Sequence, residues 1–221
     1  MSWINDTIKA LWFWLLSPLA LLTAVLGSAL LLTASPLIWP KLYTAPAGVS
    51  IHAQEDGETI AKNLWTTTPY KEVSRSLKGR RLINDEIHHY DDLQIKFREL
   101  KNLVIITSLI AAIALYSRKR LPVTYLSLAW LVLLSLIGTL WALIAWRHFF
   151  QTLHWWIFQD DSWLLPWGCY SLDIYPYSVW KKSMVFMVGY SLLVYICIIA
   201  SSQRIQSRKK RKDAQRSCED A

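Results

Sequence analysis

Long uncharged runs of apolar residues dominate the hydropathy pattern of this chain. A helix of about twenty such residues crosses a hydrocarbon core of roughly 30 Å. The runs predict four membrane-spanning helices, over about residues 10–38, 102–118, 122–146 and 183–203. The pattern therefore predicts an all-α integral membrane protein with four transmembrane helices, forming a single membrane domain over residues 1–221.

Polar residues gather between and after these runs, in two segments over residues 41–101 and 147–182 and in a basic tail over residues 204–221. In the first segment, residues 55–65 and 70–78 predict short helices, because Pro69 breaks the first and can start the second. From Asn84 the sequence contains no helix breaker. It predicts one helix that begins outside the membrane and continues into the second span.

Orientation follows from the lysines and arginines close to the span ends. Arg118, Lys119 and Arg120 are packed into the minimal connection between the second and third spans, and seven of the 24 basic residues lie in residues 204–216. This density predicts that the connection and the tail face the cytoplasm. With four spans, both termini are then inside. The segments 41–101 and 147–182 lie together on the outer side.

The composition excludes several classes of protein. Hydrophobic residues make up 53% of the chain and charged residues 18%, a balance that favours a membrane protein. The sequence has no P-loop and no GxGxxG motif, and its polar segments are too short for a separate nucleotide-binding domain. Although the net charge is +8, the run RIQSRKKRK directly after the last span favours contact with anionic membrane lipid over nucleic acid.

His89 begins an apolar face on the helix predicted from Asn84. The apolar positions that follow it at helical spacing are Leu93, Phe97, Leu100 and Val104. Asp92, three residues after His89, is near enough to the same face to accept a hydrogen bond from the imidazole and fix its tautomer. Alternatively, the run HHYDD is a solvated helix start, where acidic residues are favourable.

The second outer segment is rich in aromatic residues. Residues 149–180 contain five tryptophans, three tyrosines and three phenylalanines, interrupted by Pro166, Gly168 and Pro176. Because Trp and Tyr prefer the headgroup level, this composition predicts a short helix and an aromatic loop in the outer membrane interface. The segment is then either an anchoring belt or a site built around His154, since a belt alone needs no ionisable group.

Two other chemistries are open to these residues. The His and Asp side chains of HHYDD together with His154 could supply a zinc site, although the chain has no HExxH motif and no cysteine near them. A serine-based triad is disfavoured, because no GxSxG motif occurs. The sequence predicts no metal and no cofactor.

The two histidine-bearing regions resemble a known family. The first carries E-x-x-H-aromatic-x-D-L at Glu86, His89, Tyr90, Asp92 and Leu93, and the second carries H-x-x-x-F from His154, then Trp163, Pro166 and LDIYPYSVW. This pattern is similar to that of the lipoprotein intramolecular transacylases of the Lit type, four-span bacterial membrane proteins. The family more usually has Met and Phe where this chain has Tyr90 and Leu153, changes that conserve packing.

The resemblance implies a function. It implies a membrane acyltransferase that moves an acyl chain within a diacylglyceryl lipoprotein, from the glyceryl group to the amine of the N-terminal cysteine, leaving the lyso form. It also implies a multi-pass protein of the bacterial cytoplasmic (inner) membrane, with its active site on the outer face. His89 and His154 match the catalytic histidines of the family. The residues expected to orient them or line the site are Glu86, Tyr90, Asp92, Trp163 and Tyr175.

An intramolecular acyl shift suits a chain without an enzyme nucleophile, because the attacking amine is already tethered near the ester. The step needs a base, an acid and donors for the oxyanion. His154 is expected to act as base and acid, and His89 to position or stabilise charge, with the reverse assignment open. The alternatives are a non-catalytic membrane scaffold and a lipid acyl hydrolase using the same histidines. A transporter component is disfavoured, because no span carries a charged residue in its interior.

Overall fold

The computed structural model describes residues 10–43, 49, 51–116, 120–161 and 163–219. Over these residues the chain is helical, with no strand. Four helices are long and apolar enough to cross a membrane, Trp14–Thr33, Asn84–Tyr116, Val123–Ile144 and Ser178–Ile205. The predicted all-α class with four candidate spans is therefore confirmed.

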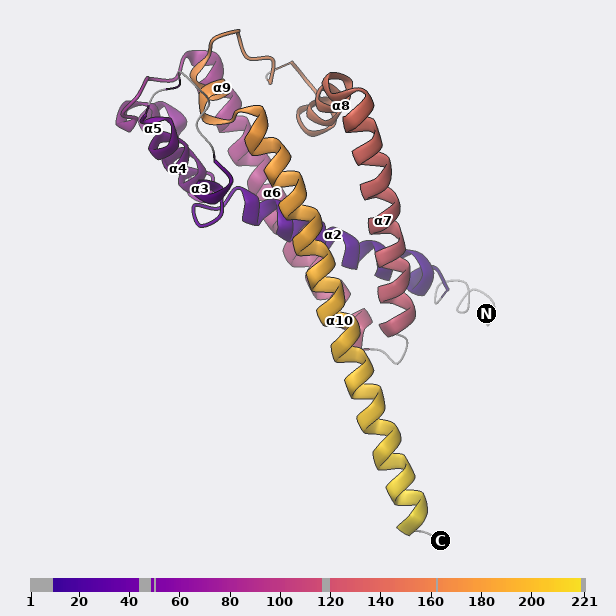
Figure 1. Ribbon diagram of the computed structural model, residues 1–221. Helices are drawn as coiled ribbons and strands as arrows, with labels where there is room; N and C mark the ends of the chain where they lie inside the picture. The colour runs from indigo at the N-terminus through magenta and orange to yellow at the C-terminus, as the bar shows by residue number, and fades with distance from the viewer. Residues whose placement is uncertain (1–9, 44–48, 50, 117–119, 162, 220–221) are drawn as a thin grey trace, which may run out of the picture.

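The elements run along the chain as η1 (Trp12–Leu16), α2 (Ser17–Thr33), α3 (Trp39–Leu42), α4 (Ala53–Asn63), α5 (Tyr70–Ser76), α6 (Asn84–Tyr116), α7 (Arg120–Ile144), α8 (Trp146–Phe158), α9 (Tyr170–Ile174) and α10 (Tyr177–Glu219). The absence of a helix breaker after Asn84 predicts α6 correctly as one helix. α10 is also continuous and carries the basic tail away from the bundle (Figure 1).

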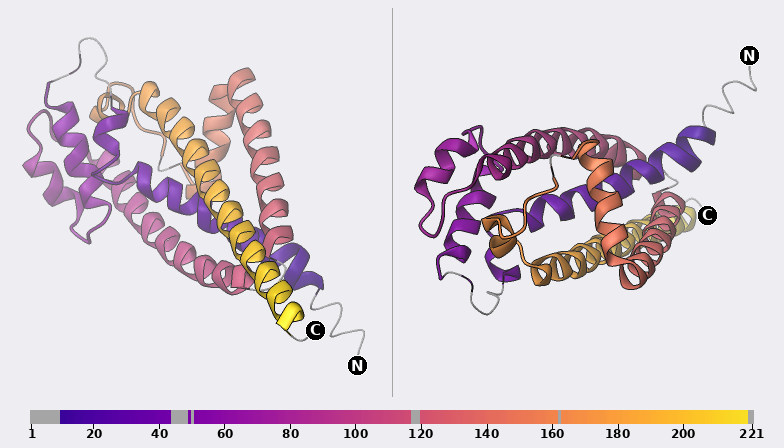
Figure 2. Two further views of the ribbon diagram at one scale, coloured as in Figure 1. Left: turned by 60° about the horizontal axis from the view of Figure 1, so that its bottom comes forward. Right: turned by 90° about the horizontal axis from the view of Figure 1, so that it is seen from above.

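α2 is the central helix of the bundle. It passes between α6 on one side and α7 and α10 on the other, as Figure 2 shows from above. In the apolar stretch of this candidate span 56% of the residues are buried, compared with 11–17% in the corresponding stretches of the other three. Small residues allow this close packing: a Cβ at Gly27 would overlap the side chain of Val104 on α6.

The two outer segments lie at the same end of the bundle, which we call the outer end. It carries α3, α4, α5, α8 and α9, whereas the ends of α6 and α7 that adjoin their connection lie at the opposite end (Figure 1). Arg118 and Lys119, on which the orientation argument depends, lie outside the described residues. The side of the membrane that the outer end faces therefore stays a prediction.

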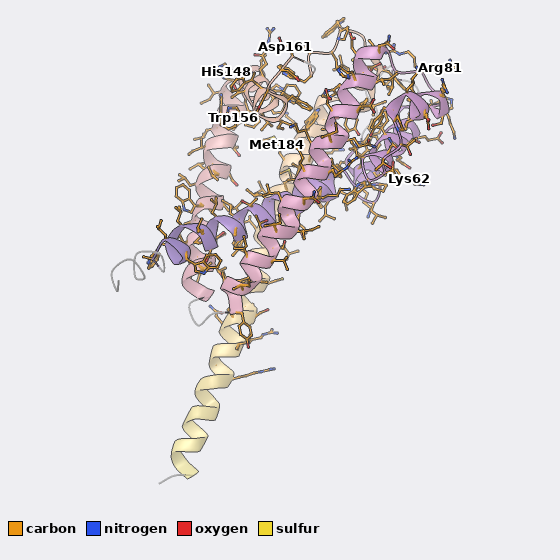
Figure 3. The ribbon with its side chains drawn as sticks, turned by 180° about the vertical axis from the view of Figure 1, so that it is seen from behind. Lys62, Arg81, His148, Trp156, Asp161 and Met184 are labelled. Atoms are coloured by element: carbon orange, nitrogen blue, oxygen red, sulfur yellow. The ribbon has the colours of Figure 1, made fainter. Side chains whose placement is uncertain are left out.

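At the outer end, α3, α4, α5 and α9 pack around the first turns of α6. The fully buried side chains of this small core include Trp39, Ile60, Tyr70 and Ile174. Viewed from behind, the outer end has a charged side marked by Lys62 and Arg81 and another side marked by His148, Trp156 and Asp161 (Figure 3). The charged side belongs to the first outer segment, and the other side to α8 and the loop after it.

A buried carboxylate on α4 joins the two outer segments. Asp56 is 1% exposed and accepts hydrogen bonds from the backbone N–H groups of Lys78 and Gly79, both at 2.7 Å, and from the Tyr170 hydroxyl at 2.6 Å. A Cβ at Gly79 would overlap that hydroxyl, so glycine allows Tyr170 its close approach. Arg80 adds a hydrogen bond of 2.7 Å to the carbonyl oxygen of Gly168.

Two further carboxylates sit at helix N-termini of the same region. Glu86, in the first turn of α6, accepts from the backbone N–H of Ile83 at 2.9 Å and from the N–H and Oγ–H of Ser171 at 2.6 and 2.7 Å. Asp91 accepts from the backbone N–H of Tyr70 at the start of α5, at 2.9 Å. These bonds satisfy N–H groups that a helix start leaves without an intrahelical partner. They fix α5 and α9 against α6.

α8 is attached differently. The chain turns at Ala145 (φ −142°, ψ 58°), and α8 then runs from the end of α7 across the bundle towards α6 (Figure 2). It ends at Phe158. The next residue, Gln159, has a φ of 60°, and a second residue of positive φ, Gly168 at 80°, closes the following loop. The predicted short helix and folded loop are present. Their depth in the membrane interface stays a prediction.

Candidate functional site

His89 lies at the outer end of α6 with its ring partly buried. Its Nδ1 atom is buried and has no hydrogen-bond partner. The expected hydrogen bond to Asp92 is not formed, so the i to i+3 spacing alone did not fix the imidazole. The ring instead packs against Phe158 of α8, with 4.9 Å between the two ring centroids.

The surroundings of His89 keep it neutral. Burial lowers its pKa to about 4, and the charge of a protonated His154 lowers it as well, while the carboxylates of Asp92 and Asp160 act in the opposite direction. Asp92 therefore influences His89 through its charge. At neutral pH the His89 imidazole is uncharged, with one N–H donor and one acceptor nitrogen.

His154 is on α8 and is 8% exposed. Its Nδ1 lies 2.8 Å from the carbonyl oxygen of Phe150, one helical turn earlier. Because a carbonyl oxygen only accepts, Nδ1 carries the proton and the lone pair of the neutral ring is on Nε2. Burial lowers the pKa of His154, and the hydrogen bond to Phe150 opposes this shift. The helix backbone thus sets the tautomer, without a carboxylate.

The structure brings the two histidines against one side chain, Phe158. The rings of His154 and Phe158 are stacked with centroids 6.0 Å apart, and the ring of His89 lies on the same phenylalanine. Neighbouring rings form a closed circuit of His89, Phe158, His154, Trp180, Tyr175 and Tyr90. With Trp39 and Trp163, which pack on Tyr175 and His154, we call these rings the aromatic cluster.

Unpaired polar atoms are concentrated in this cluster. Within the described residues, the buried side-chain polar atoms without a hydrogen-bond partner belong to Trp39, His89, Tyr90, Trp163 and Ser191. Only Ser191 is outside the cluster. Buried polar groups normally have partners, and a group that lacks one needs an explanation. Their gathering around two histidines is the strongest sign of a functional site in the structure.

The expected lining residues divide into two kinds. Tyr90, Tyr175 and Trp163 belong to the aromatic cluster. The Tyr90 hydroxyl has Ser171 in its neighbourhood but no hydrogen bond of good geometry, and burial raises its pKa well above the usual value. Glu86 is fully buried, and its hydrogen bonds are with Ile83 and Ser171. It holds the backbone that leads to Tyr175, and none of these hydrogen bonds goes to His89 or His154.

Several residues of this region were not predicted. Phe158 was noted only as the last residue of the H-x-x-x-F pattern, and its place in the site could have been found, because Phe150, His154 and Phe158 recur at spacings of four and so share one face of a helix. Trp39 comes from the end of the first apolar run, and nothing in its local sequence relates it to residues more than a hundred positions later. Asp56 lies in a helix with several acidic residues, and the sequence does not show which of their carboxylates is buried.

The remaining histidines lie away from the cluster. His52 is near Glu55, His148 packs beside Trp141, and His88 is exposed on α6. Within the part of the chain that the structure describes, no three His, Cys, Asp or Glu side chains gather as metal ligands would. The arrangement that is present, two neutral imidazoles among aromatic rings, can transfer protons at neutral pH.

Comparison with known proteins identifies a family. The model of a family described as "Lipoprotein intramolecular transacylase Lit" matches residues 13–168. This region includes both histidines and Trp163, and it ends before Tyr175 and Trp180. No curated protein and no solved structure matches the chain.

Proposed function

The chain belongs to the lipoprotein intramolecular transacylase family, Lit, and from this membership we propose that it moves an acyl chain within a bacterial diacylglyceryl lipoprotein. The acyl group passes from the glyceryl moiety to the amine of the N-terminal cysteine. The product is the lyso form, with one free glyceryl hydroxyl and one new amide. The family match covers more than half of the chain and includes both histidines.

The step is an acyl shift from oxygen to nitrogen. The cysteine amine attacks the ester carbonyl carbon, and a C–N bond forms as the carbonyl oxygen becomes an oxyanion. The intermediate then expels the glyceryl oxygen, which takes up a proton as the C–O bond breaks. Because amine and ester belong to one molecule, their meeting costs little entropy. The enzyme must move one proton from nitrogen to oxygen and stabilise the oxyanion.

His154 is the proposed base and acid. The observation that carries this assignment is the hydrogen bond from its Nδ1–H to the carbonyl oxygen of Phe150. It leaves Nε2 free to take the amine proton and return it to the glyceryl oxygen. The lowered pKa of His154 supports this role, because a base must be unprotonated before it acts.

His89 is the proposed partner that positions or stabilises charge. With a pKa of about 4, its ring is a weaker base than that of an ordinary histidine. This asymmetry favours His154 as the base and His89 as a neutral hydrogen-bonding group. The Nδ1 atom of His89 is buried without a partner, so no hydrogen bond of the free protein competes for it.

The proposed location follows from the apolar surface. The exposed rings of Trp155, Trp156 and Trp167 on α8 and its loop suit the headgroup region of a bilayer, where lipid esters lie. We place the outer end on the extracytoplasmic face of a bacterial cytoplasmic membrane. The basic end of α10 then contacts anionic lipid of the inner leaflet.

Mass spectrometry of a lipoprotein N-terminal peptide tests this function. Purified protein in detergent should convert a diacylglyceryl lipopeptide into the isomer of equal mass that carries an N-acyl cysteine. His154→Ala should lower the rate at least about 100-fold. The control His88→Ala, an exposed neighbour of His89, should retain it.

Each alternative function gives a different outcome. A lipid acyl hydrolase would release free fatty acid, with a loss of mass from the lipopeptide. A scaffold would leave the lipopeptide unchanged while tolerating alanine at both histidines. A rate that falls to background on chelation would favour a metal site. A folded His154→Ala protein with the wild-type rate would overturn the proposed mechanism.

A further inference from the structure

The acyl shift needs hydrogen-bond donors at the oxyanion, and a neutral His89 can supply only one N–H. We propose that the indole N–H of Trp163 is a second donor. The proposal rests on the proposed function and adds a third catalytic side chain to it. Trp163 would bind the ester carbonyl oxygen while His154 takes the proton of the attacking amine.

The Trp163 N–H is unused in the structure. Its Nε1 atom is buried and has no acceptor, which leaves an indole donor with its hydrogen-bonding capacity unmet. Tryptophan in a folded protein usually finds a partner for this group when it is buried. A carbonyl oxygen of a substrate would be such a partner.

The position of Trp163 fits the task. Its ring lies 5.2 Å from the ring of His154, centroid to centroid. A base and an oxyanion donor act on the same reacting centre, each about 3 Å from it, and must therefore be close neighbours without bonding to each other. Phe150 and Phe158, which also pack on His154, have no donor to offer.

Trp163 is carried by a loop that turns at two residues. The residue lies in the loop between Gln159 and Gly168, both in the positive-φ region. Outside this loop, Tyr170 and Ser171 are anchored by Asp56 and Glu86. The donor is thus carried by a loop that has two turning points, next to a segment that is held by buried hydrogen bonds.

In the reaction, the carbonyl carbon gains the amine nitrogen and its π electrons move to oxygen. The Trp163 N–H stabilises that negative oxygen and does not give up its proton. When the intermediate collapses, the C=O bond re-forms and the glyceryl oxygen leaves with the proton delivered by His154. The donor is unchanged after each turnover. Its contribution appears in the transition state more than in substrate binding.

The test removes the N–H while keeping the shape of the side chain. Trp163 is replaced by 3-(3-benzothienyl)alanine, in which sulfur takes the place of the indole N–H, and in a second variant by Trp163→Phe. The kcat for N-acyl lipopeptide formation should fall by about 100- to 1000-fold. KM should change little, and the thermal midpoint should not fall, because no hydrogen bond of the free protein is lost.

Trp167 supplies the matched control. It lies in the same loop and is 98% exposed, so the same two replacements there should leave kcat unchanged. If the protein with benzothienylalanine at position 163 keeps a kcat within about threefold of wild type, the donor role is overturned, because the loss expected for an oxyanion donor is much larger. A wild-type protein that forms no N-acyl product would refute the proposed function and with it this role. The two failures are distinguishable, because the first leaves wild-type transfer intact.

Discussion

Two parts of the outer end are held together by different forces. Around α5 and α9, the buried carboxylates of Asp56 and Glu86 and the half-buried carboxylate of Asp91 accept hydrogen bonds from neighbouring backbone N–H groups. We call this region the polar frame. In the aromatic cluster, rings pack on rings and buried polar atoms remain unpaired. The frame has its buried polar groups paired within the protein, whereas the cluster has unpaired polar atoms, which under the proposed function would bind a substrate.

This division fits how active sites relate to their scaffolds. Buried polar groups without hydrogen-bond partners lower stability, and a site that contains them needs rigid structure around it. Here, Glu86 bonds to Ser171, four residues before Tyr175 of the cluster. Mutations should therefore fall into two groups. Those in the frame should lower the free energy of unfolding, and those in the cluster should lower the rate of the reaction.

The largest expected effect is in the cluster. His89→Leu should lower the rate of N-acyl formation by about 100-fold or more, a typical loss for a group acting in proton transfer or charge stabilisation. Its thermal midpoint should stay the same or rise, because the change removes a buried nitrogen without a partner. Activity and thermal unfolding are measured on the same detergent preparation. A clear drop in midpoint would make His89 a structural residue of the frame.

The next largest effect is in the frame. Glu86→Ala should lower the free energy of unfolding by on the order of 3 kcal/mol, because it removes the acceptor of the Ile83 N–H and leaves the buried N–H and hydroxyl of Ser171 without theirs. Asp85→Ala, at the exposed neighbouring position, is the control. Thermal unfolding compares the two. Equal midpoints for Glu86→Ala and Asp85→Ala would contradict the division.

The fold was largely readable from the sequence, because its signals are local. Uncharged apolar runs predict the four long helices, and the lack of a breaker after Asn84 predicts the continuity of α6. The frame was not readable: Asp56 meets Tyr170 across 114 positions, and Glu86 meets Ser171 across 85. Nothing local distinguishes those carboxylates from solvated neighbours. Only packing decides which acidic side chain is buried.

The site was partly readable. His89 and His154 were singled out by their settings and by the family resemblance, and the structure brings both against Phe158. Asp92 shows the limit of helical spacing as a guide. A separation of three residues allows a hydrogen bond to His89, but the His89 ring packs on Phe158 instead and the bond is not formed. The group that orients His154 is the backbone carbonyl of Phe150, and because every residue has such a carbonyl, the sequence does not reveal it.

A smaller effect should appear in the pH profile. His154 as base must be neutral, and its neutral fraction falls as pH drops through its pKa. Because burial lowers that pKa below 6.5, the acidic limb of kcat/KM should lie below pH 6.5. Phe158→Ala should expose the His154 ring, raise its pKa and move the acidic limb to higher pH. Trp156→Ala, at an exposed position of α8, should not.

The ratio of variant to wild-type kcat/KM at each pH isolates the enzyme group, because the titration of the substrate amine cancels. The ratio for Phe158→Ala should fall as the pH is lowered from 7 to 5. A ratio independent of pH would mean that burial by Phe158 does not set the pKa of the base.

The smallest expected effect is at the edge of the cluster. Asp92→Asn removes a carboxylate whose charge raises the pKa of His89 but which forms no hydrogen bond with it. The pKa of His89 should fall further, and since the ring is already neutral at pH 7, its protonation state there should not change. The rate should therefore drop by no more than about fivefold, far less than the loss expected on removing an acid-base group. A loss as large as that of His89→Leu would mean that Asp92 forms a direct bond to His89 in the substrate complex, and the orientation by hydrogen bond that the sequence suggests would then apply to the working enzyme.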